Sequence, residues 1–221
     1  MTRDAFSDAE RRAVYHAIFA RRDMRRFVPG TAMPAAVLTR VLRAAHAAPS
    51  VGLMQPWRFI RITKAPLRQA IHRMVDDERR RTAEALGERE AEFLALKVEG
   101  ILECAELLVV ALCGDRDRHV FGRRTMPQMD LASAACAIQN VWLAARAEGY
   151  GVGWVSIFDP AELARLLGIP GDAEPIAVLC LGEVPEFPDR PQLELDHWAT
   201  ARPLAEFVFE NRWGRTGRVS G

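Results

Sequence analysis

One long apolar segment, residues 129–148, does most to limit how this 221-residue chain can fold. Ala, Ile, Val, Leu and Trp side chains occupy most of its circumference when it is drawn as a helix, and Gly149 follows where helices favour a left-handed glycine. A helix that is apolar on nearly all sides must be covered on nearly all sides. We therefore expect residues 129–148 to form a central helix with other elements packed around it.

Shorter periodic segments lie on both sides of this central helix. Helical spacing predicts helices over residues 8–21, 34–48, 67–104 with a break at Gly87, and 160–168, and strand patterns occur at 57–62, 107–112, 151–157 and 175–181. Because two long helical stretches interrupt any regular βαβ alternation, the pattern favours an α+β fold with a helix-flanked sheet. We expect one domain over residues 1–221, with an extended, Pro-rich arm from about residue 187.

Composition argues against several classes of function. Thirty basic against 29 acidic residues leave a formal net charge of +1, so no global field favours nucleic acid or an anionic membrane. The apolar runs are too short to span a bilayer, and the N-terminus is polar. The four cysteines have no Cys-x-x-Cys spacing, which favours reduced thiols in or near a core over a zinc site or a disulfide scaffold. We expect a cytoplasmic protein without a metal site and without nucleic-acid or membrane partners.

Three arginines and one aspartate gather where the first helix should end. Arg21, Arg22 and Arg25 place three positive charges within one turn. A guanidinium matches a phosphate in two-point geometry, so the cluster could hold the phosphate and the pyrimidine edge of FMN. The alternative is a cationic helix end that interacts with its own dipole. Asp23 lies among these arginines, where a carboxylate can be an oriented acceptor or a base.

Other short motifs narrow the chemistry further. Gly151-x-Gly153 follows a helix and enters a strand, the reverse of a dinucleotide-binding loop. These glycines would permit backbone to approach a flat ring closely, and Ser156 would offer a hydroxyl near the same surface. No H-E-x-x-H, Walker A or G-x-S-x-G motif occurs, and the five histidines show no ligand pairing, so metal and serine hydrolysis are poorly supported.

Taken together, these segments resemble the nitroreductase-like flavoprotein superfamily, and more closely its 5,6-dimethylbenzimidazole synthase branch, the BluB-type enzymes. The resemblance covers nearly the whole chain and is carried by residues 13–15 with Ile18, 21–25, 44–52, 54–57, 96–101, 129–130, 139–149 and 153–157. General nitroreductases usually carry serine where Asp23 stands, so this aspartate separates the two branches.

The resemblance implies a nitroreductase-like fold, with a mostly antiparallel central sheet flanked by helices, in an intertwined homodimer. It implies that reduced FMN is the substrate as well as the bound flavin. Dioxygen would be consumed in cutting it into 5,6-dimethylbenzimidazole, the lower ligand of vitamin B12, and erythrose 4-phosphate. A separate NAD(P)H-dependent flavin reductase would supply the reduced FMN.

The resemblance also implies roles for particular residues. The phosphate would be held by Arg21, Arg22 and Arg202, and the pyrimidine part of the ring by Arg25 and Gln55. The remaining flavin-binding positions would be Met24, Ser50, Lys97 and Gly153. Asp23 would be base or orienter for proton removal at the ribityl carbon, and Ser156 would hydrogen-bond near flavin N5 or the bound oxygen. The helical stretch at residues 67–100 and the loop at 113–127 are candidate covers over the ring.

Two other functions stay open at this point. An NAD(P)H-dependent FMN nitroreductase or flavin reductase would keep its flavin intact and transfer hydride. A non-catalytic flavin-binding protein would use the same arginines and be indifferent to Asp23→Asn. Asp23, together with the absence of a convincing nicotinamide motif, favours the synthase.

Overall fold

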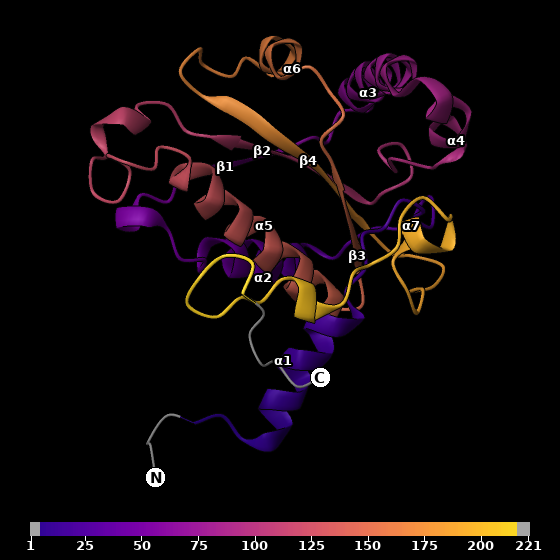
Figure 1. Ribbon diagram of the computed structural model, residues 1–221. Coiled ribbons are helices and arrows are strands. Elements are labelled where there is room, and N and C mark those ends of the chain that lie inside the picture. Colours follow the sequence, from indigo (N-terminus) through magenta and orange to yellow (C-terminus); the bar gives the residue numbers. More distant parts are fainter. Residues whose placement is uncertain (1–4, 216–221) are drawn as a thin grey trace. The chain divides into compact units, whose positions relative to one another are not determined.

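The computed structural model describes residues 5–215, which form the elements labelled in Figure 1. Its α-helices are α1 (Asp8–Ala20), α2 (Ala35–His46), α3 (Ala65–Leu86), α4 (Glu90–Ala95), α5 (Met129–Ala147), α6 (Pro160–Leu167) and α7 (Gln192–Leu195). Its strands are β1 (Trp57–Arg61), β2 (Glu106–Leu112), β3 (Gly151–Val155) and β4 (Glu174–Gly182). Short 3₁₀ turns are η1 (Val51–Leu53), η2 (Gly87–Arg89), η3 (Arg116–Arg118) and η4 (Leu204–Glu206).

The four strands form one antiparallel sheet in the order β1-β2-β4-β3. Every residue of β2 is buried, as expected of a strand covered on both faces. Since successive side chains of a strand point to opposite faces, alternate residues of β2 and β4 enter two separate apolar clusters. The α+β class and the mostly antiparallel sheet predicted from the sequence are confirmed.

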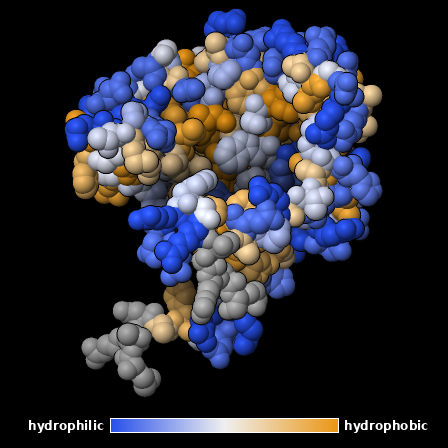
Figure 2. Space-filling view, in the orientation of Figure 1, coloured by the Kyte–Doolittle hydropathy of each residue, from blue (hydrophilic) through white to orange (hydrophobic). Residues whose placement is uncertain are grey.

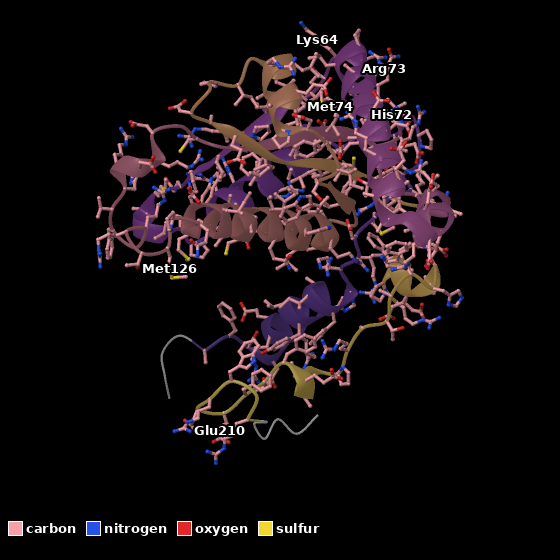
Figure 3. The ribbon with its side chains drawn as sticks, turned by 45° about the horizontal axis from the view of Figure 1, so that its top comes forward. Lys64, His72, Arg73, Met74, Met126 and Glu210 are labelled. Atoms are coloured by element: carbon pink, nitrogen blue, oxygen red, sulfur yellow. The ribbon has the colours of Figure 1, made fainter. Side chains whose placement is uncertain are left out.

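Helices cover both faces of this sheet (Figure 1). One cluster packs α2 and α5 against the sheet, and Ile138 and Val141 of α5 are fully buried in it. The other packs α3 and α6 on the opposite face, with Ile71 and Leu163 fully buried. Figure 3 labels His72, Arg73 and Met74 on α3. The apolar segment that the sequence predicts as the central helix is therefore α5.

One predicted helix is wrong in its second half. The pattern extends to Cys104, and the break at Gly87 is confirmed, but α4 ends at Ala95. Glu99 instead accepts a hydrogen bond from the Ile101 backbone N–H at 2.6 Å, which closes a turn. Gly100 packs so tightly on Phe27 that an added Cβ would lie 2.5 Å from its ring. This contact across the fold overrides the local helical pattern.

The described chain divides into two compact units, and the boundary along the sequence lies between Asp189 and Arg190. The second unit contains α7 and η4, so the tail that the sequence predicts to be extended includes a short helix. Within it, Arg202 donates to Glu206 at 2.7 Å and lies over the Phe207 ring. The single domain with an arm from about residue 187 stays a prediction.

Candidate functional site

The segment after α1 is bound directly to β3. Asp23 forms a parallel bridge with Val152, and the Met24 N–H donates to the Val152 carbonyl at 2.9 Å. A Cβ on Gly153 would lie 2.1 Å from the Met24 carbonyl oxygen, so only glycine leaves room for this backbone. The sequence predicts that Gly153 lets a flat ring approach the backbone of β3. On this side of β3, the group that approaches Gly153 is instead the Met24 carbonyl of the same chain.

The Asp23 carboxylate is fixed by three donors. The two terminal nitrogens of Arg25 each donate to one of its oxygens, and the Trp154 backbone N–H donates to Oδ1 at 3.1 Å. The Asp23 side chain nevertheless remains 39% exposed. The Asp23 carboxylate is thus held in one orientation and remains partly accessible, and its role toward a ligand stays a prediction.

Arg21 and Arg22 serve different purposes. Arg22 Nη1 donates to the carbonyls of Phe19 and Arg21, each at 2.7 Å, so this residue caps the end of α1. Arg21 lies over the Trp142 ring, 5.0 Å from its centroid, and within residues 5–215 its guanidinium donates to no acceptor. Arg22 therefore caps the C-terminal end of α1, whereas the guanidinium donors of Arg21 remain available to an anion.

Two buried N–H groups beside this segment have no partner among the described residues. They are Nε of Arg22 and the indole Nε1 of Trp154. A buried donor without an acceptor costs free energy unless a ligand or water supplies one. Together with the free donors of Arg21, they make the edge of β3 suited to a ligand rich in acceptors, such as the phosphate and ribityl oxygens of FMN.

Ser50 and Gln55 share a loop that is held in an unusual backbone conformation. Leu53 and Gln55 have φ values of 53° and 46°, in the left-handed region that non-glycine residues rarely adopt. Ser50 Oγ accepts from the Gln55 N–H at 3.0 Å, and Ser133 of α5 accepts from the Val51 N–H at 3.0 Å. Such backbone strain gathers at functional sites.

Lys97 is connected to the segment after α1 through Glu103. One Glu103 oxygen pairs with the Lys97 ammonium, and the other accepts from the Phe27 N–H at 3.3 Å. Lys97 also lines a hollow of about 290 Å³, together with Arg26 and Arg79. The structure thus links Lys97, although indirectly, to the part of the chain that carries Asp23 and Arg25.

Ser156 follows β3 and opens onto a second hollow, of about 520 Å³. The apolar walls of this hollow include Leu112, Phe158 and Ile176, and Figure 2 shows hollowed, partly apolar surface between α5 and α6. Ser156 is exposed and lies two residues beyond Trp154, whose N–H holds Asp23.

The same hollow is lined by a buried charge network that the sequence did not reveal. Asp130 of α5 accepts from Arg116 at 2.9 Å and from Arg123 at 3.1 Å, and Asp130 and Arg123 are 6% and 8% exposed. The network fixes the loop at residues 113–127 against α5. A charged residue at the start of an otherwise apolar helix was the available signal for Asp130, and a polar hydroxyl in the next turn was the signal for Ser133.

The structure brings some of the predicted residues together and leaves others apart. Asp23, Met24, Arg25 and Gly153 form one contiguous group on β3, whereas Ser50 and Gln55 form a separate loop. Arg202 belongs to the second unit, so its predicted contact with the phosphate remains a prediction. Among residues 5–215, no group of three or more His, Cys, Asp or Glu side chains could hold a metal. Within the same range, no helix is both long and apolar enough to cross a membrane.

Sequence comparison decides the family. Residues 18–183 match the model of the nitroreductase family. The chain belongs to this family. It is 38% identical over 189 residues to the 5,6-dimethylbenzimidazole synthase of Rhodospirillum rubrum, covering 83% of this chain and 87% of the relative. It is 37% identical over 203 residues to the enzyme of the same name from Rhodobacter capsulatus, covering 90% and 96%.

A solved structure agrees on the fold. A BluB-like flavoprotein from Clostridium difficile 630 superposes with a TM-score of 0.69 at 20% identity, covering 90% of this chain and 99% of that chain. The predicted nitroreductase-like fold and the resemblance to the 5,6-dimethylbenzimidazole synthase branch are confirmed. Membership of the nitroreductase family supports flavin as the ligand class of this chain.

Proposed function

We propose that this chain is a 5,6-dimethylbenzimidazole synthase that fragments reduced FMN with dioxygen and releases erythrose 4-phosphate. The observation that carries the proposal is the 37–38% identity to two synthases of this name over most of the chain. The orientation of Asp23 by Arg25 and the Trp154 N–H supports it, because this aspartate is the residue that distinguishes the synthase branch.

Reduced FMN would bind beside the segment of residues 21–25, which itself pairs with the outer edge of β3. Arg21 supplies unpaired donors for the phosphate, Arg22 adds an unpartnered Nε, and Arg202 would join them from the second unit. Arg25 and Gln55 would face the pyrimidine ring. The backbone at Met24 and Gly153, with Ser50 and Lys97, would complete the contacts.

The bound reduced flavin supplies the electrons that dioxygen takes up, and the protein positions protons around it. Asp23 would accept or orient the proton that leaves the ribityl carbon destined to become C2 of the product. Arg25 and Trp154 hold both carboxylate oxygens, so Asp23 would act from one fixed direction. Ser156 would donate its hydroxyl proton near flavin N5 or the bound oxygen, at the mouth of the hollow lined by Leu112, Phe158 and Ile176.

We also propose that the active form is a homodimer. No residue of α1 is buried, although the helix carries Val14, Tyr15, Ile18 and Phe19. Tyr15 and Phe19 stack on each other with ring centroids 6.1 Å apart, and Phe19 is 72% exposed. A contiguous apolar helix face of this kind requires a cover, and a second copy of the chain would provide it. A cytoplasmic location and a separate NAD(P)H-dependent flavin reductase remain part of this proposal.

The direct test is to mix the purified protein with photoreduced FMN, admit air and identify the products by chromatography and mass. The synthase forms 5,6-dimethylbenzimidazole with a matching loss of flavin. Complete recovery of oxidised FMN with hydrogen peroxide would instead indicate a flavin reductase. Recovery of FMN at the rate of the protein-free control would indicate a non-catalytic flavin-binding protein.

A further inference from the structure

Asp130 lies in the first turn of α5, and its side chain is buried. Both carboxylate oxygens accept hydrogen bonds, Oδ1 from the Leu131 N–H at 2.6 Å and Oδ2 from Arg116 and Arg123 at 2.9 and 3.1 Å. The two arginines belong to the loop at residues 113–127. One buried carboxylate therefore joins two guanidinium groups of this loop to the start of α5.

The two guanidinium groups also hold the backbone of the loop. Arg116 Nη1 donates to the Cys113 carbonyl at 2.6 Å, where the loop begins. Arg123 Nε donates to the Pro127 carbonyl at 3.1 Å, where it ends, and Arg123 Nη1 donates to the Arg116 carbonyl. Both ends of the loop are thus fastened to the groups that pair with Asp130.

The tip of the loop packs on η1, the turn that follows Ser50. A Cβ on Gly52 would lie 3.2 Å from the Phe121 carbonyl oxygen. A Cβ on Gly122 would overlap the Val51 side chain, and the φ of 77° at Gly122 also favours glycine. The loop therefore extends from the start of α5 to the strained segment that carries two of the predicted flavin contacts.

The loop also forms part of the second hollow, which Ser156 lines together with the two arginines and Asp130. Its tip is held by few apolar contacts, because Val120 and Phe121 are 59% and 84% exposed. The ion pairs with Asp130 are therefore the main attachment of this wall to the rest of the fold.

The charge of Asp130 has no equivalent replacement. Asp117 and Glu174 lie 3.5 Å from Arg123 and 3.7 Å from Arg116, and both of these carboxylates are exposed. Without the charge of Asp130, two guanidinium groups would lack their buried carboxylate, which is strongly unfavourable. Since α5 keeps its apolar contacts, the loop can relieve this cost by local opening, in which the arginines move into water.

We propose that Asp130 is a positioning residue for the synthase reaction. Through Arg116 and Arg123 it holds the loop at residues 113–127 as a wall of the hollow that Ser156 lines. When its charge is lost, the wall detaches and water enters, so that more of the reduced FMN returns as oxidised FMN and less becomes 5,6-dimethylbenzimidazole. The inference rests on the proposed function, and Asp130 acts through the loop rather than on the flavin.

The first test is limited digestion of the full chain with trypsin, without flavin, with the cleavage sites mapped by mass spectrometry. The Arg123 side chain is buried in the parent protein, so cleavage after it requires the loop to open. We expect Asp130→Asn to raise the rate of this cleavage by about tenfold or more. The matched control is Asp117→Asn, which removes the exposed carboxylate near Arg123 and should leave the rate at the parent value.

The second test measures FMN affinity and product balance separately. Asp130→Asn should bind FMN as tightly as the parent protein. Its yield of 5,6-dimethylbenzimidazole from saturating reduced FMN in air should fall by up to about a hundredfold, the cost of misplaced groups around a reaction. Arg123→Gln weakens the same attachment from the loop, without a change in α5, and should lower the yield in the same direction.

The two tests keep this inference distinct from the synthase proposal. Cleavage after Arg123 at the parent rate in Asp130→Asn would overturn the inference, whether or not the parent protein makes 5,6-dimethylbenzimidazole. A parent-level yield from a variant whose loop is cut would also overturn it, as would a loss of FMN affinity that matches the loss of yield. Absence of product from the parent protein would count against the synthase proposal alone, because the trypsin test needs no flavin.

Discussion

Two adjacent segments of this chain differ sharply in how they are held. The helix α1 buries no residue and keeps an apolar face exposed. The residues that follow soon after it, Asp23 to Arg25, are fixed by a backbone hydrogen bond to β3 and by the Asp23–Arg25 ion pair. The Met24 carbonyl also packs directly against Gly153, which has no side chain to block it. The chain therefore fixes its candidate chemical groups against β3, while the helix that leads to them keeps its apolar face exposed.

The largest effect is expected from Asp23→Asn, a substitution in the segment that is fixed to β3. Asn in place of Asp23 can still accept from the Trp154 N–H but loses the charge that Arg25 pairs with and the capacity to take a proton. We expect 5,6-dimethylbenzimidazole formation to fall by about 10²- to 10⁴-fold, the usual worth of a general base. The rate is measured from reduced FMN in air.

The matched control is Asp8→Asn, which removes an exposed carboxylate from the first turn of α1. It should leave the rate at the parent value. An Asp23→Asn variant that makes product at the parent rate would remove Asp23 from the mechanism.

Gly153→Ala tests how the segment is held. The new methyl group would meet the Met24 carbonyl, so the backbone must separate, and we expect the free energy of unfolding to fall by about 3 kcal/mol. Gly171→Ala is the control, because a Cβ there has no atom within 4 Å. Chemical denaturation measures both. Equal stability of the two variants would contradict the close approach of Met24 to β3.

Arg21→Ala tests the unpaired guanidinium. Removing a charge-assisted contact to the phosphate should weaken FMN binding by about tenfold to a hundredfold. Binding is measured by flavin fluorescence. Arg12→Ala, in the exposed part of α1, is the control. Riboflavin lacks the phosphate and should bind equally well to the parent and to Arg21→Ala; a similar loss with riboflavin would place Arg21 elsewhere on the ligand.

Phe19→Asp tests the exposed face of α1. In the proposed homodimer a second copy would cover this surface, so a charge there should weaken dimerisation by about tenfold. Analytical ultracentrifugation over a concentration series measures the constant. Exchange of another exposed apolar residue, Leu204→Asp in the second unit, is the comparison. A parent protein that is monomeric at all concentrations would contradict the dimer itself.

The smallest effect concerns the cap of α1. Hydrogen bonds from the side chain and backbone of Ser7 lower the pKa of Glu10. A carboxyl group whose pKa is lower in the folded state stabilises the folded protein at pH values above its unfolded-state pKa. This contribution is lost as the pH falls through its folded-state pKa. Glu10→Gln should therefore have a slightly flatter stability profile on the acid side, measured as thermal midpoint against pH. The same pH dependence of the thermal midpoint below neutral pH in Glu10→Gln and in the parent would contradict a contribution of the Ser7–Glu10 hydrogen bonds to stability.

Much of this molecule can be predicted from its sequence, because most helices and strands follow local apolar periodicity. The failures arise where distant residues decide the outcome. The helical pattern across residues 96–104 yields to the packing of Gly100 on Phe27. The glycines of β3 receive Met24, a contact that no local pattern encodes.

The candidate site follows the same rule. Asp23 and Arg25 lie two residues apart in the sequence, so their pairing could be expected. The network of Asp130 with Arg116 and Arg123 joins a loop to a helix start, and the distinction between Arg21 and Arg22 depends on the end of α1. These arrangements require the folded chain.

The most direct measurement of the central claim is the product balance of one aerobic reaction with reduced FMN. The account predicts that each FMN lost appears as one 5,6-dimethylbenzimidazole, and that Asp23→Asn shifts the balance toward oxidised FMN and hydrogen peroxide. Full recovery of oxidised FMN by the parent protein, with no 5,6-dimethylbenzimidazole, would contradict it.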